Sequence, residues 1–238
     1  MRLFILVFLS IINMNTDISH TPSSSGAKLY YLVREPKIKT DHPPLILLLH
    51  GVGSNERDLF SFADRLPANF LVVSARAPLT IGTDSYAWFH IDYSTGKRVI
   101  NKAQAEKSRT ILLQFLEQLK IEHPYNDKQV FLCGFSQGGI MSYSVALTRP
   151  DLIKGIAILS GRLLDEVKPM VATDEQLKNL KVFMAHGTQD NVIGVDFARS
   201  ALAYLKSKHL QPTYKEYTLA HGINNEVLTD LLNWLNEQ

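Results

Sequence analysis

The stretch FLCGFSQGGIM, residues 131–141, decides the fold expected for this chain. It joins a strand pattern, QVFLCGF, to a helix pattern, GGIMSYSVAL, and Ser136 lies at the junction in the pattern G-x-S-x-G. A serine on a sharp strand-to-helix turn holds its hydroxyl clear of a sheet, where it can act as a nucleophile. Gly134 and Gly138 would relieve the crowding of such a turn, and Gly139 would let the helix pack closely on the sheet. A turn with a purely structural role is the alternative.

Seven short β-rich runs alternate with helix-like runs along the chain. The β-rich runs are residues 28–35, 44–50, 70–76, 129–135, 155–161, 181–187 and 213–219. The middle five are apolar nearly throughout, which is typical of strands buried on both faces of a parallel sheet. Apolar stripes at helical spacing predict helices at 102–121, 195–206 and 223–236. The alternation predicts an α/β fold with a mostly parallel central sheet of about seven strands, helices on both faces and right-handed crossovers.

Composition places the chain among ordinary globular proteins. Of its 238 residues, 45% are hydrophobic and 20% charged, and no low-complexity linker follows residue 26, so we expect residues 26–238 to form a single domain. The 25 basic and 23 acidic residues are interspersed, which argues against a nucleic-acid partner or a membrane surface. The single cysteine, Cys133, excludes an internal disulfide framework and a cysteine-rich metal site. Its place on an apolar strand predicts a buried, unreactive thiol.

Residues 1–25 form an apolar segment followed by a polar tail. MRLFILVFLSII carries one positive charge and an apolar run of about ten residues, which suits a signal-peptide core and is too short to span a membrane as a helix. No A-x-A cleavage pattern follows, and Met14 is an alternative start. The sequence predicts no stable membrane span and leaves the location open between the cytoplasm and export.

Ser136 needs a base, because a serine hydroxyl is a poor nucleophile near neutral pH. In this kind of site the chain order is serine, then an acid, then histidine, and three histidines follow Ser136. His221 comes after the last predicted strand, in TLAHGINNE, where a base would extend from a loop. His186 ends a strand before another loop, and His209 closes a surface-type helix. His221 is the favoured base, and an ordinary loop or capping residue is its alternative interpretation.

The acid that orients this base should lie in the loop after the preceding strand. MAHGTQDNVIG provides Asp190 there, where it could bind one ring nitrogen of His221 and leave the other facing Ser136. Asp196 is the competitor, although its position suits the first turn of a helix. Asp165 and Asp174 lie earlier, on an irregular segment. Asp190 is the favoured acid.

An oxyanion at this site would need two preorganised N–H donors. One is the backbone N–H of Gln137, the residue after the nucleophile, and the other should come from the loop LLLHGVGSN. Gly51 and Gly53 would let that loop turn, so that the N–H of Val52 could point inward. His50 is interpreted as a structural residue that fixes the loop by hydrogen bonds.

Two irregular segments, 77–101 and 161–180, follow strand ends and are candidate walls of a pocket, because ligands of open α/β sheets bind beyond the carboxyl ends of the strands. Leu79 and Phe89 from the first segment and Leu163 from the second are candidate substrate-binding residues. Packing on the core is the alternative role for these side chains. The histidines that precede glycines are not paired at metal-ligand spacing, so the sequence predicts no metal and no cofactor.

Five motifs in this order, HGVGSNERD, YAWFHI, GFSQGG, HGTQDNV and AHGI, resemble the phospholipase/carboxylesterase family. That family includes the acyl-protein thioesterases and small bacterial serine carboxylesterases, within the α/β-hydrolase fold. The resemblance runs from about Leu29 to the end of the chain. The resemblance implies that the catalytic triad is Ser136, Asp190 and His221. It also implies that Val52 and Gln137 are the two oxyanion donors and that Trp88 lines the substrate groove.

The chain departs from the family pattern at two places. His90 stands where members often have an aspartate after WF, and NVIG stands where they often have a sequence of the form xVVP. The departures put the geometry of the nearby loops in question and leave the three triad positions in place.

These patterns favour a carboxylesterase that cleaves small to medium acyl esters through an acyl-enzyme intermediate. A thioesterase or lysophospholipase for long acyl chains is the first alternative. A non-catalytic binding module on a hydrolase scaffold is the second, because a fold alone does not establish activity. The expected partner is a small-molecule ester, and the sequence leaves monomer and homodimer open.

Overall fold

The computed structural model describes residues 29–92, 94, 96 and 98–238. The apolar segment at residues 1–13, the possible start at Met14 and the expected boundary near residue 26 lie outside the described residues. Within the described part, no helix is both long and apolar enough to cross a membrane.

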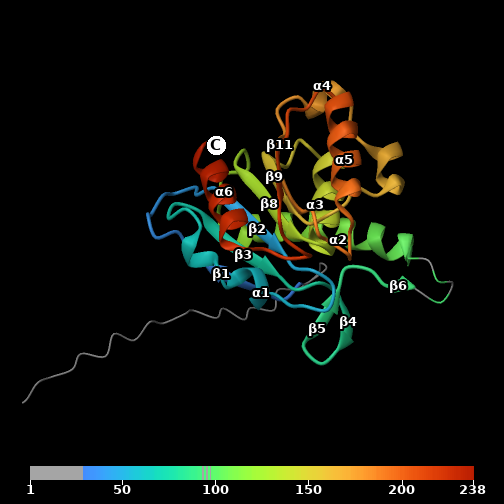
Figure 1. Ribbon diagram of the computed structural model, residues 1–238. Helices are drawn as coiled ribbons and strands as arrows, with labels where there is room; N and C mark the ends of the chain where they lie inside the picture. The colour runs from blue at the N-terminus through green and yellow to red at the C-terminus, as the bar shows by residue number, and fades with distance from the viewer. Residues whose placement is uncertain (1–28, 93, 95, 97) are drawn as a thin grey trace, which may run out of the picture.

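Seven strands of the described chain form one central sheet, in the order β1-β3-β2-β8-β9-β10-β11 (Figure 1). They are β1 (Tyr31–Arg34), β2 (Leu45–Leu49), β3 (Leu71–Ala75), β8 (Val130–Phe135), β9 (Gly155–Leu159), β10 (Lys181–Gly187) and β11 (Thr213–Tyr217). β1 pairs antiparallel with β3, and all other neighbours pair parallel. Each β-rich run of the sequence contains one of these strands, so the predicted sheet is confirmed.

The inner strands are apolar throughout because both faces of the sheet are covered. Every residue of β2, β3 and β9 is buried. Successive side chains of a strand point to opposite faces. Accordingly Leu45, Leu47 and Leu49 of β2 belong to one hydrophobic cluster, and Ile46 and Leu48 belong to a second cluster on the other face.

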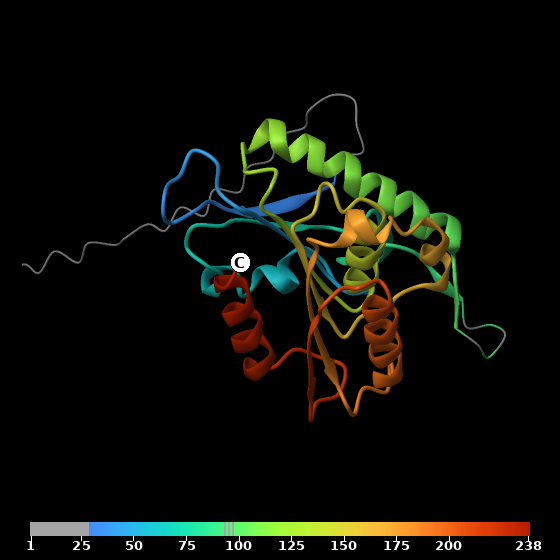
Figure 2. The same cartoon turned by 90° about the horizontal axis from the view of Figure 1, so that it is seen from above.

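Helices cover both faces, as the sequence predicted (Figure 2). The first cluster is completed by α2 (Lys102–Glu122), α3 (Gln137–Thr148) and α5 (Val195–Ser207). The second is completed by α1 (Arg57–Phe60), the 3-10 turn η1 (Ala63–Arg65) and α6 (Asn225–Asn236). The predicted apolar stripes are the buried sides of these helices, as on α2, which buries Leu112, Phe115, Leu116 and Leu119.

The two irregular segments contain short elements that the sequence did not predict. Segment 77–101 folds into two antiparallel pairs, β4 (Leu79–Gly82) with β5 (Ser85–Ala87) and β6 (Ile91–Asp92) with β7 (Val99–Ile100). The β4–β5 hairpin stands at the lower edge of the view in Figure 1. Segment 161–180 contains the 3-10 helix η2 (Asp165–Met170) and the short α4 (Asp174–Leu177). Both segments adjoin the carboxyl ends of parallel strands.

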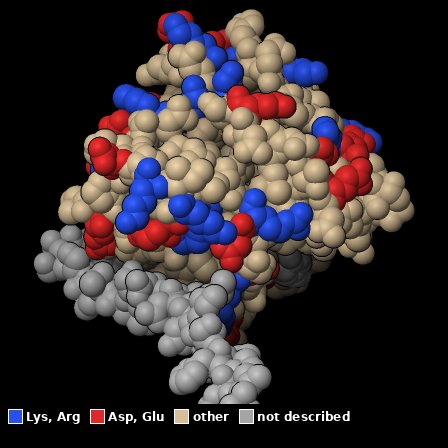
Figure 3. All heavy atoms as spheres, turned by 90° about the vertical axis from the view of Figure 1, so that its left-hand side faces the viewer, with Lys and Arg blue, Asp and Glu red and all other residues tan. Residues whose placement is uncertain are grey.

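The described surface in Figure 3 carries Lys and Arg side chains interspersed with Asp and Glu side chains. Several of the surface charges of the chain form ion pairs, such as Lys37 with Asp64 at 3.0 Å and Lys215 with Asp230 at 2.7 Å. The mixed surface reflects the near balance of 25 basic and 23 acidic residues.

Candidate active site

Ser136 connects β8 to α3 in a strained turn. Its backbone has φ 53° and ψ −113°, in the region of positive φ that residues with a side chain rarely adopt. The N–H of Ser136 donates to the Leu159 carbonyl at 2.9 Å, and its carbonyl accepts from the Ile140 N–H at 3.1 Å. Strain of this kind persists only where the surrounding structure holds it, and it is concentrated at functional sites.

The glycines around Ser136 allow the helix to approach the sheet. A Cβ atom on Gly138 would lie 1.9 Å from the carbonyl oxygen of Leu49, and one on Gly134 would lie 2.3 Å from the carbonyl oxygen of Gly138. A Cβ atom on Gly139 would lie 3.2 Å from the Cα atom of Gly161, in the segment after β9. The close packing expected from GFSQGG is present, and a larger residue at Gly134 or Gly138 would force backbone apart.

The loop after β11 brings His221 to the serine. The Ser136 hydroxyl lies 2.9 Å from Nε2 of His221, and the imidazole packs against the Phe135 ring with 4.9 Å between ring centroids. Ser136 itself is buried. Neither of the other two histidines after the serine hydrogen-bonds its hydroxyl: His186 contacts Ile193 and Asp190, and the exposed His209 lies near an aspartate of α4.

Asp190 lies on the opposite side of His221. Its Oδ2 is 2.7 Å from Nδ1 of His221, and its Oδ1 accepts hydrogen bonds from the N–H groups of Val192 and Ile193 at 2.9 and 2.8 Å. A carboxylate can only accept, so Nδ1 carries the proton and Nε2 accepts from Ser136. The competitor Asp196 is an exposed residue that pairs with Arg199.

A buried histidine, His186, holds the loop that carries this aspartate, which we term the acid loop (residues 186–194). Nε2 of His186 donates to the Ile193 carbonyl at 2.6 Å and lies 3.3 Å from Oδ2 of Asp190. The contact closes the acid loop on itself. The sequence pattern offered His186 only as a second candidate base, and its position at the end of a buried strand was the available sign of a structural role.

The loop after β2, which we term the oxyanion loop (residues 50–56), passes directly beside the serine. A Cβ atom on Gly51 would lie 3.4 Å from Cβ of Ser136. No described residue accepts a hydrogen bond from the N–H of the next residue, Val52. Gln137 begins α3, and the first N–H groups of a helix have no partner within it. The N–H groups of Val52 and Gln137 thus belong to the residues that follow Gly51 and Ser136, and the N-terminus of α3 places the positive end of the helix dipole at the same turn.

Trp88 and Phe89 connect the start of the oxyanion loop to the start of α3. The Gln137 side chain accepts from the Trp88 N–H and donates to the Phe89 carbonyl, both at 2.7 Å. The Trp88 indole N–H donates to the His50 carbonyl at 3.0 Å. Both aromatic side chains are fully buried, which agrees with the alternative role of packing on the core. Substrate contact by Trp88 and Phe89 stays a prediction. The motif YAWFHI indicated their importance but could not distinguish a groove wall from a support.

The comparisons with known proteins agree with this fold. The chain matches the family described as Phospholipase/Carboxylesterase over residues 33–238. The chain belongs to this family. Carboxylesterase SOBER1 of Arabidopsis thaliana is 27% identical over 203 residues, which cover 80% of this chain and 88% of that protein. Acyl-protein thioesterase 1 of Mycosarcoma maydis is 34% identical over 201 residues, which cover 74% and 81%. The crystal structure of esterase PE8 has a TM-score of 0.74 at 26% identity, and covers 88% of this chain and 99% of that one.

The remaining candidate substrate residues are Leu79 and Leu163, which stand on different irregular segments. Leu79 is half-buried at the start of β4. Leu163 is half-buried and lines a cavity of about 470 Å³ between residues 98–102, residues 162–168 and α5. Nη1 of Arg98, in the cavity wall, donates to the Val192 carbonyl at 3.1 Å, so the cavity adjoins the acid loop. Substrate binding by Leu79 and Leu163 stays a prediction.

The cysteine and the metal-ligand residue types are the alternative reactive groups. Burial raises the pKa of the Cys133 thiol to about 12, so the expected inert thiol is present. Among the residues that the structure describes, no three His, Cys, Asp or Glu side chains are arranged to hold a metal ion.

Proposed function

We propose that this protein is a serine carboxylesterase in which Ser136 is the nucleophile, His221 the general base and acid, and Asp190 the residue that orients His221. One observation carries the proposal. The three side chains form a continuous row of hydrogen bonds, with 2.9 Å from Ser136 Oγ to His221 Nε2 and 2.7 Å from His221 Nδ1 to Asp190 Oδ2.

The row supports acyl transfer in two stages. Oγ of Ser136 attacks the ester carbonyl carbon while Nε2 of His221 takes the hydroxyl proton. The tetrahedral intermediate collapses, and the alcohol leaves with that proton. Water then attacks the acyl-enzyme, again giving a proton to Nε2, and the carboxylic acid leaves as Oγ recovers a proton. The carboxylate of Asp190 stabilises the charged imidazole at each stage.

The oxyanion of each intermediate would be held by the backbone N–H groups of Val52 and Gln137. Support comes from their positions beside Ser136 and from the absence of a described acceptor for the Val52 N–H. Preorganised donors of this kind contribute about 10²–10³ each to the rate. The N-terminal end of α3 adds a favourable field.

Small to medium acyl esters are the substrates that we favour. The cavity beside the acid loop offers apolar side chains such as Leu163 and Phe197, but its wall also holds charged side chains, among them Arg98, Lys102 and Glu166. A long acyl tail needs an apolar wall along its length. Action on a long-chain thioester or lysophospholipid, suggested by the relative named acyl-protein thioesterase, is the second candidate.

The direct test removes the nucleophile. Ser136→Ala should lower kcat for p-nitrophenyl butyrate on the order of 10⁶-fold, as loss of a triad nucleophile does in other serine hydrolases. Ser144→Ala is the matched control, since its hydroxyl donates to the Ile140 carbonyl within the same helix and does not reach His221. Turnover by Ser136→Ala equal to that of the control would refute the mechanism.

Two further measurements separate the alternatives. Rates with p-nitrophenyl acetate, butyrate, octanoate and palmitate should peak at the short or medium esters, and a peak at palmitate would favour the long-chain candidate. A fluorophosphonate probe should label wild-type protein at Ser136. Folded protein that takes up no label would instead be a binding module.

A further inference from the structure

Two carboxylate residues are buried among those that the structure describes, Asp190 and Glu56. Asp190 faces His221, but Glu56 has no part in the proposed acyl transfer. Its side chain is 1% exposed, at the end of the oxyanion loop. Burial of an ionised carboxylate is costly unless partners compensate it. The position of Glu56 therefore calls for a partner of matching strength.

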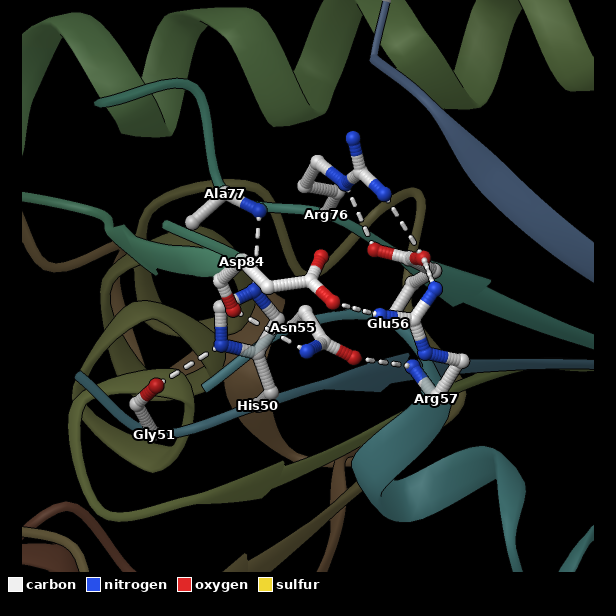
Figure 4. A network of polar contacts seen from close by, with 8 residues as sticks. All are labelled: His50, Gly51, Asn55, Glu56, Arg57, Arg76, Ala77 and Asp84. Carbon is white, nitrogen blue, oxygen red and sulfur yellow. Dashed lines mark hydrogen bonds and ion pairs between the residues drawn. The ribbon is translucent and has the colours of Figure 1, made fainter. Parts of the chain in front are cut away.

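Arg76, the residue after β3, is this partner (Figure 4). Its Nε and Nη2 donate to the two carboxylate oxygens of Glu56 at 2.6 and 2.8 Å. The guanidinium also lies over two aromatic rings, 4.1 Å from the centroid of Tyr30 and 4.4 Å from that of Tyr86. Burial raises the pKa of Glu56, but the hydrogen bonds and charge of Arg76, a backbone hydrogen bond and the charge of Arg57 together leave that pKa below its ordinary value. Nη1 of Arg57 lies 3.6 Å from Oε1 of Glu56, a longer contact than those of Arg76. The pair is ionised and held in one orientation.

Arg76 and its neighbour Ala77 together hold both ends of the oxyanion loop. Arg76 binds Glu56 at the end of the loop, and the N–H of Ala77 donates to Nε2 of His50 at its start, at 3.0 Å. Nδ1 of His50 then donates to the Gly51 carbonyl at 2.7 Å, so this ring is neutral (Figure 4). Burial lowers the pKa of His50, which favours the neutral form. Val52 lies between the two held ends.

The middle of the oxyanion loop is hydrogen-bonded to Tyr86, beside Arg76. The Gly53 N–H donates to the Tyr86 carbonyl at 2.8 Å, and the Tyr86 N–H donates to the Ser54 carbonyl at 2.9 Å. The Tyr86 ring is one of the two that cover Arg76. The loop is also held by the Trp88 indole at the His50 carbonyl, by the Ser85 hydroxyl at the Gly53 carbonyl and by the Asn55 amide at the Asp84 carbonyl. Among all these attachments, those to Arg76, Ala77 and Tyr86 converge on one place.

We propose that Arg76, acting through Glu56 and Tyr86, is a positioning residue that aims the Val52 N–H at the oxyanion. The inference rests on the proposed function. A donor stabilises an oxyanion only within about 2.7–3.1 Å of the position that the charge will occupy. The planar fork of arginine fixes a carboxylate in two directions at once, whereas lysine provides one point charge. Arg76→Lys should keep the positive charge but no longer hold the Val52 N–H in the direction of the oxyanion.

The test compares Arg76→Lys with wild-type full-length protein on p-nitrophenyl butyrate. We expect kcat to fall roughly 10- to 100-fold, because a small displacement of a catalytic donor costs about that much. KM should stay within about twofold, since the ester is bound by other groups. The Ki of a trifluoromethyl ketone, which forms a tetrahedral adduct with the serine, should rise by the factor by which kcat/KM falls.

Arg149→Lys is the matched control. Arg149 donates to both carboxylate oxygens of Asp151 at 2.9 and 2.8 Å, at the far end of α3. Its kcat and Ki should match wild type. The pH at which kcat/KM is half-maximal should be unchanged in Arg76→Lys, because the hydrogen bond of His221 to Asp190 is untouched. A shifted midpoint, a wild-type kcat or an unchanged Ki would each overturn the proposal.

The double variant Glu56→Leu/Arg76→Met covers the case in which Arg76→Lys does not fold. Removing both charges of a buried pair costs far less stability than removing one. We expect this variant to be folded, with kcat again reduced, whereas a wild-type kcat would overturn the positioning role. Wild-type protein that neither turns over the ester nor takes up the fluorophosphonate would refute the proposed function, before any variant is compared.

Discussion

The oxyanion loop after β2 and the acid loop after β10 begin alike and bury similar groups. Each starts with a histidine and a glycine, at His50 and at His186, and each histidine binds a carbonyl of its own loop, His50 that of Gly51 at 2.7 Å and His186 that of Ile193 at 2.6 Å. Each loop also buries one carboxylate, Glu56 or Asp190. The two carboxylates nevertheless meet different partners, an arginine in one loop and a histidine in the other.

The neighbouring strand decides the difference. β2 pairs with β3, and the residue just past β3 is Arg76. β10 pairs with β11, and the loop past β11 carries His221. A buried carboxylate beside a fixed guanidinium stays ionised and rigid, which suits a support. The same group beside an imidazole that also contacts a hydroxyl suits proton transfer. The role of each loop is thus decided by the residue that faces its buried carboxylate.

Among the variants that test this comparison, Asp190→Asn should have the largest effect, a loss of kcat. The amide oxygen of the new residue can still accept from the N–H groups of Val192 and Ile193, which turns its NH₂ group toward His221. Nδ1 must then be the unprotonated nitrogen, and Nε2 can no longer accept the serine proton. We expect kcat to fall about 10⁴-fold with little change in fold, measured with p-nitrophenyl butyrate and circular dichroism.

Asp196→Asn is its control, because that exposed carboxylate pairs only with Arg199 among the described residues. Its kcat should equal that of wild type. If the two variants behaved alike, Asp190 would be a structural residue like Glu56, and the contrast between the loops would disappear.

Replacing the glycine after each histidine with alanine should lower the free energy of unfolding of the protein by different amounts. A Cβ atom on Gly187 would lie 2.1 Å from the Leu219 carbonyl oxygen, which is backbone and cannot move aside. One on Gly51 would first meet the Phe135 ring at 3.2 Å, which can adjust. Overpacking typically costs about 1–3 kcal/mol, and we expect Gly187→Ala to reach or exceed that range and Gly51→Ala to stay below it.

Urea denaturation would measure both free energies of unfolding. Gly194→Ala provides the reference, because nothing lies within 4 Å of its added Cβ atom. Equal losses at Gly51 and Gly187 would show that the two loops are equally constrained, contrary to the close backbone approach at Gly187, which Gly51 does not share.

The smallest expected effect concerns pH and His50. Burial lowers the pKa of His50 in the folded protein, while the unfolded value is about 6.5. Between those two values the unfolded chain binds more protons, so stability rises with pH there, by at most about 1.4 kcal/mol per pH unit for one group. His50→Gln should flatten this acid limb of the curve of unfolding free energy against pH.

His42→Gln, at an exposed position, should leave that slope unchanged. A His50→Gln variant with the wild-type slope would mean that His50 is not the neutral, loop-closing ring that its contacts to Gly51 and Ala77 indicate.

Much of the site follows from sequence order alone. The pattern around Ser136 and the positions of Asp190 and His221 at the ends of predicted strands indicated which side chains meet, and they do meet. Parallel strands bring their carboxyl ends to one edge of the sheet, so chain order is enough to place these groups together. The burial of Trp88 was not predicted, because an aromatic run in an irregular segment suits a groove and a core equally well.

By itself, the sequence determined the alternation of seven strands with helices, the strand-to-helix turn at Ser136 and the residues that we propose for acyl transfer. These features depend on hydrophobic periodicity and on short-range spacing, both of which can be read directly from the sequence. Only the tertiary structure decided that Glu56 faces Arg76, that His186 closes the acid loop and that Trp88 supports Gln137. Each joins segments through the burial of a polar group, and a buried polar group takes its role from the partner that the fold places opposite it.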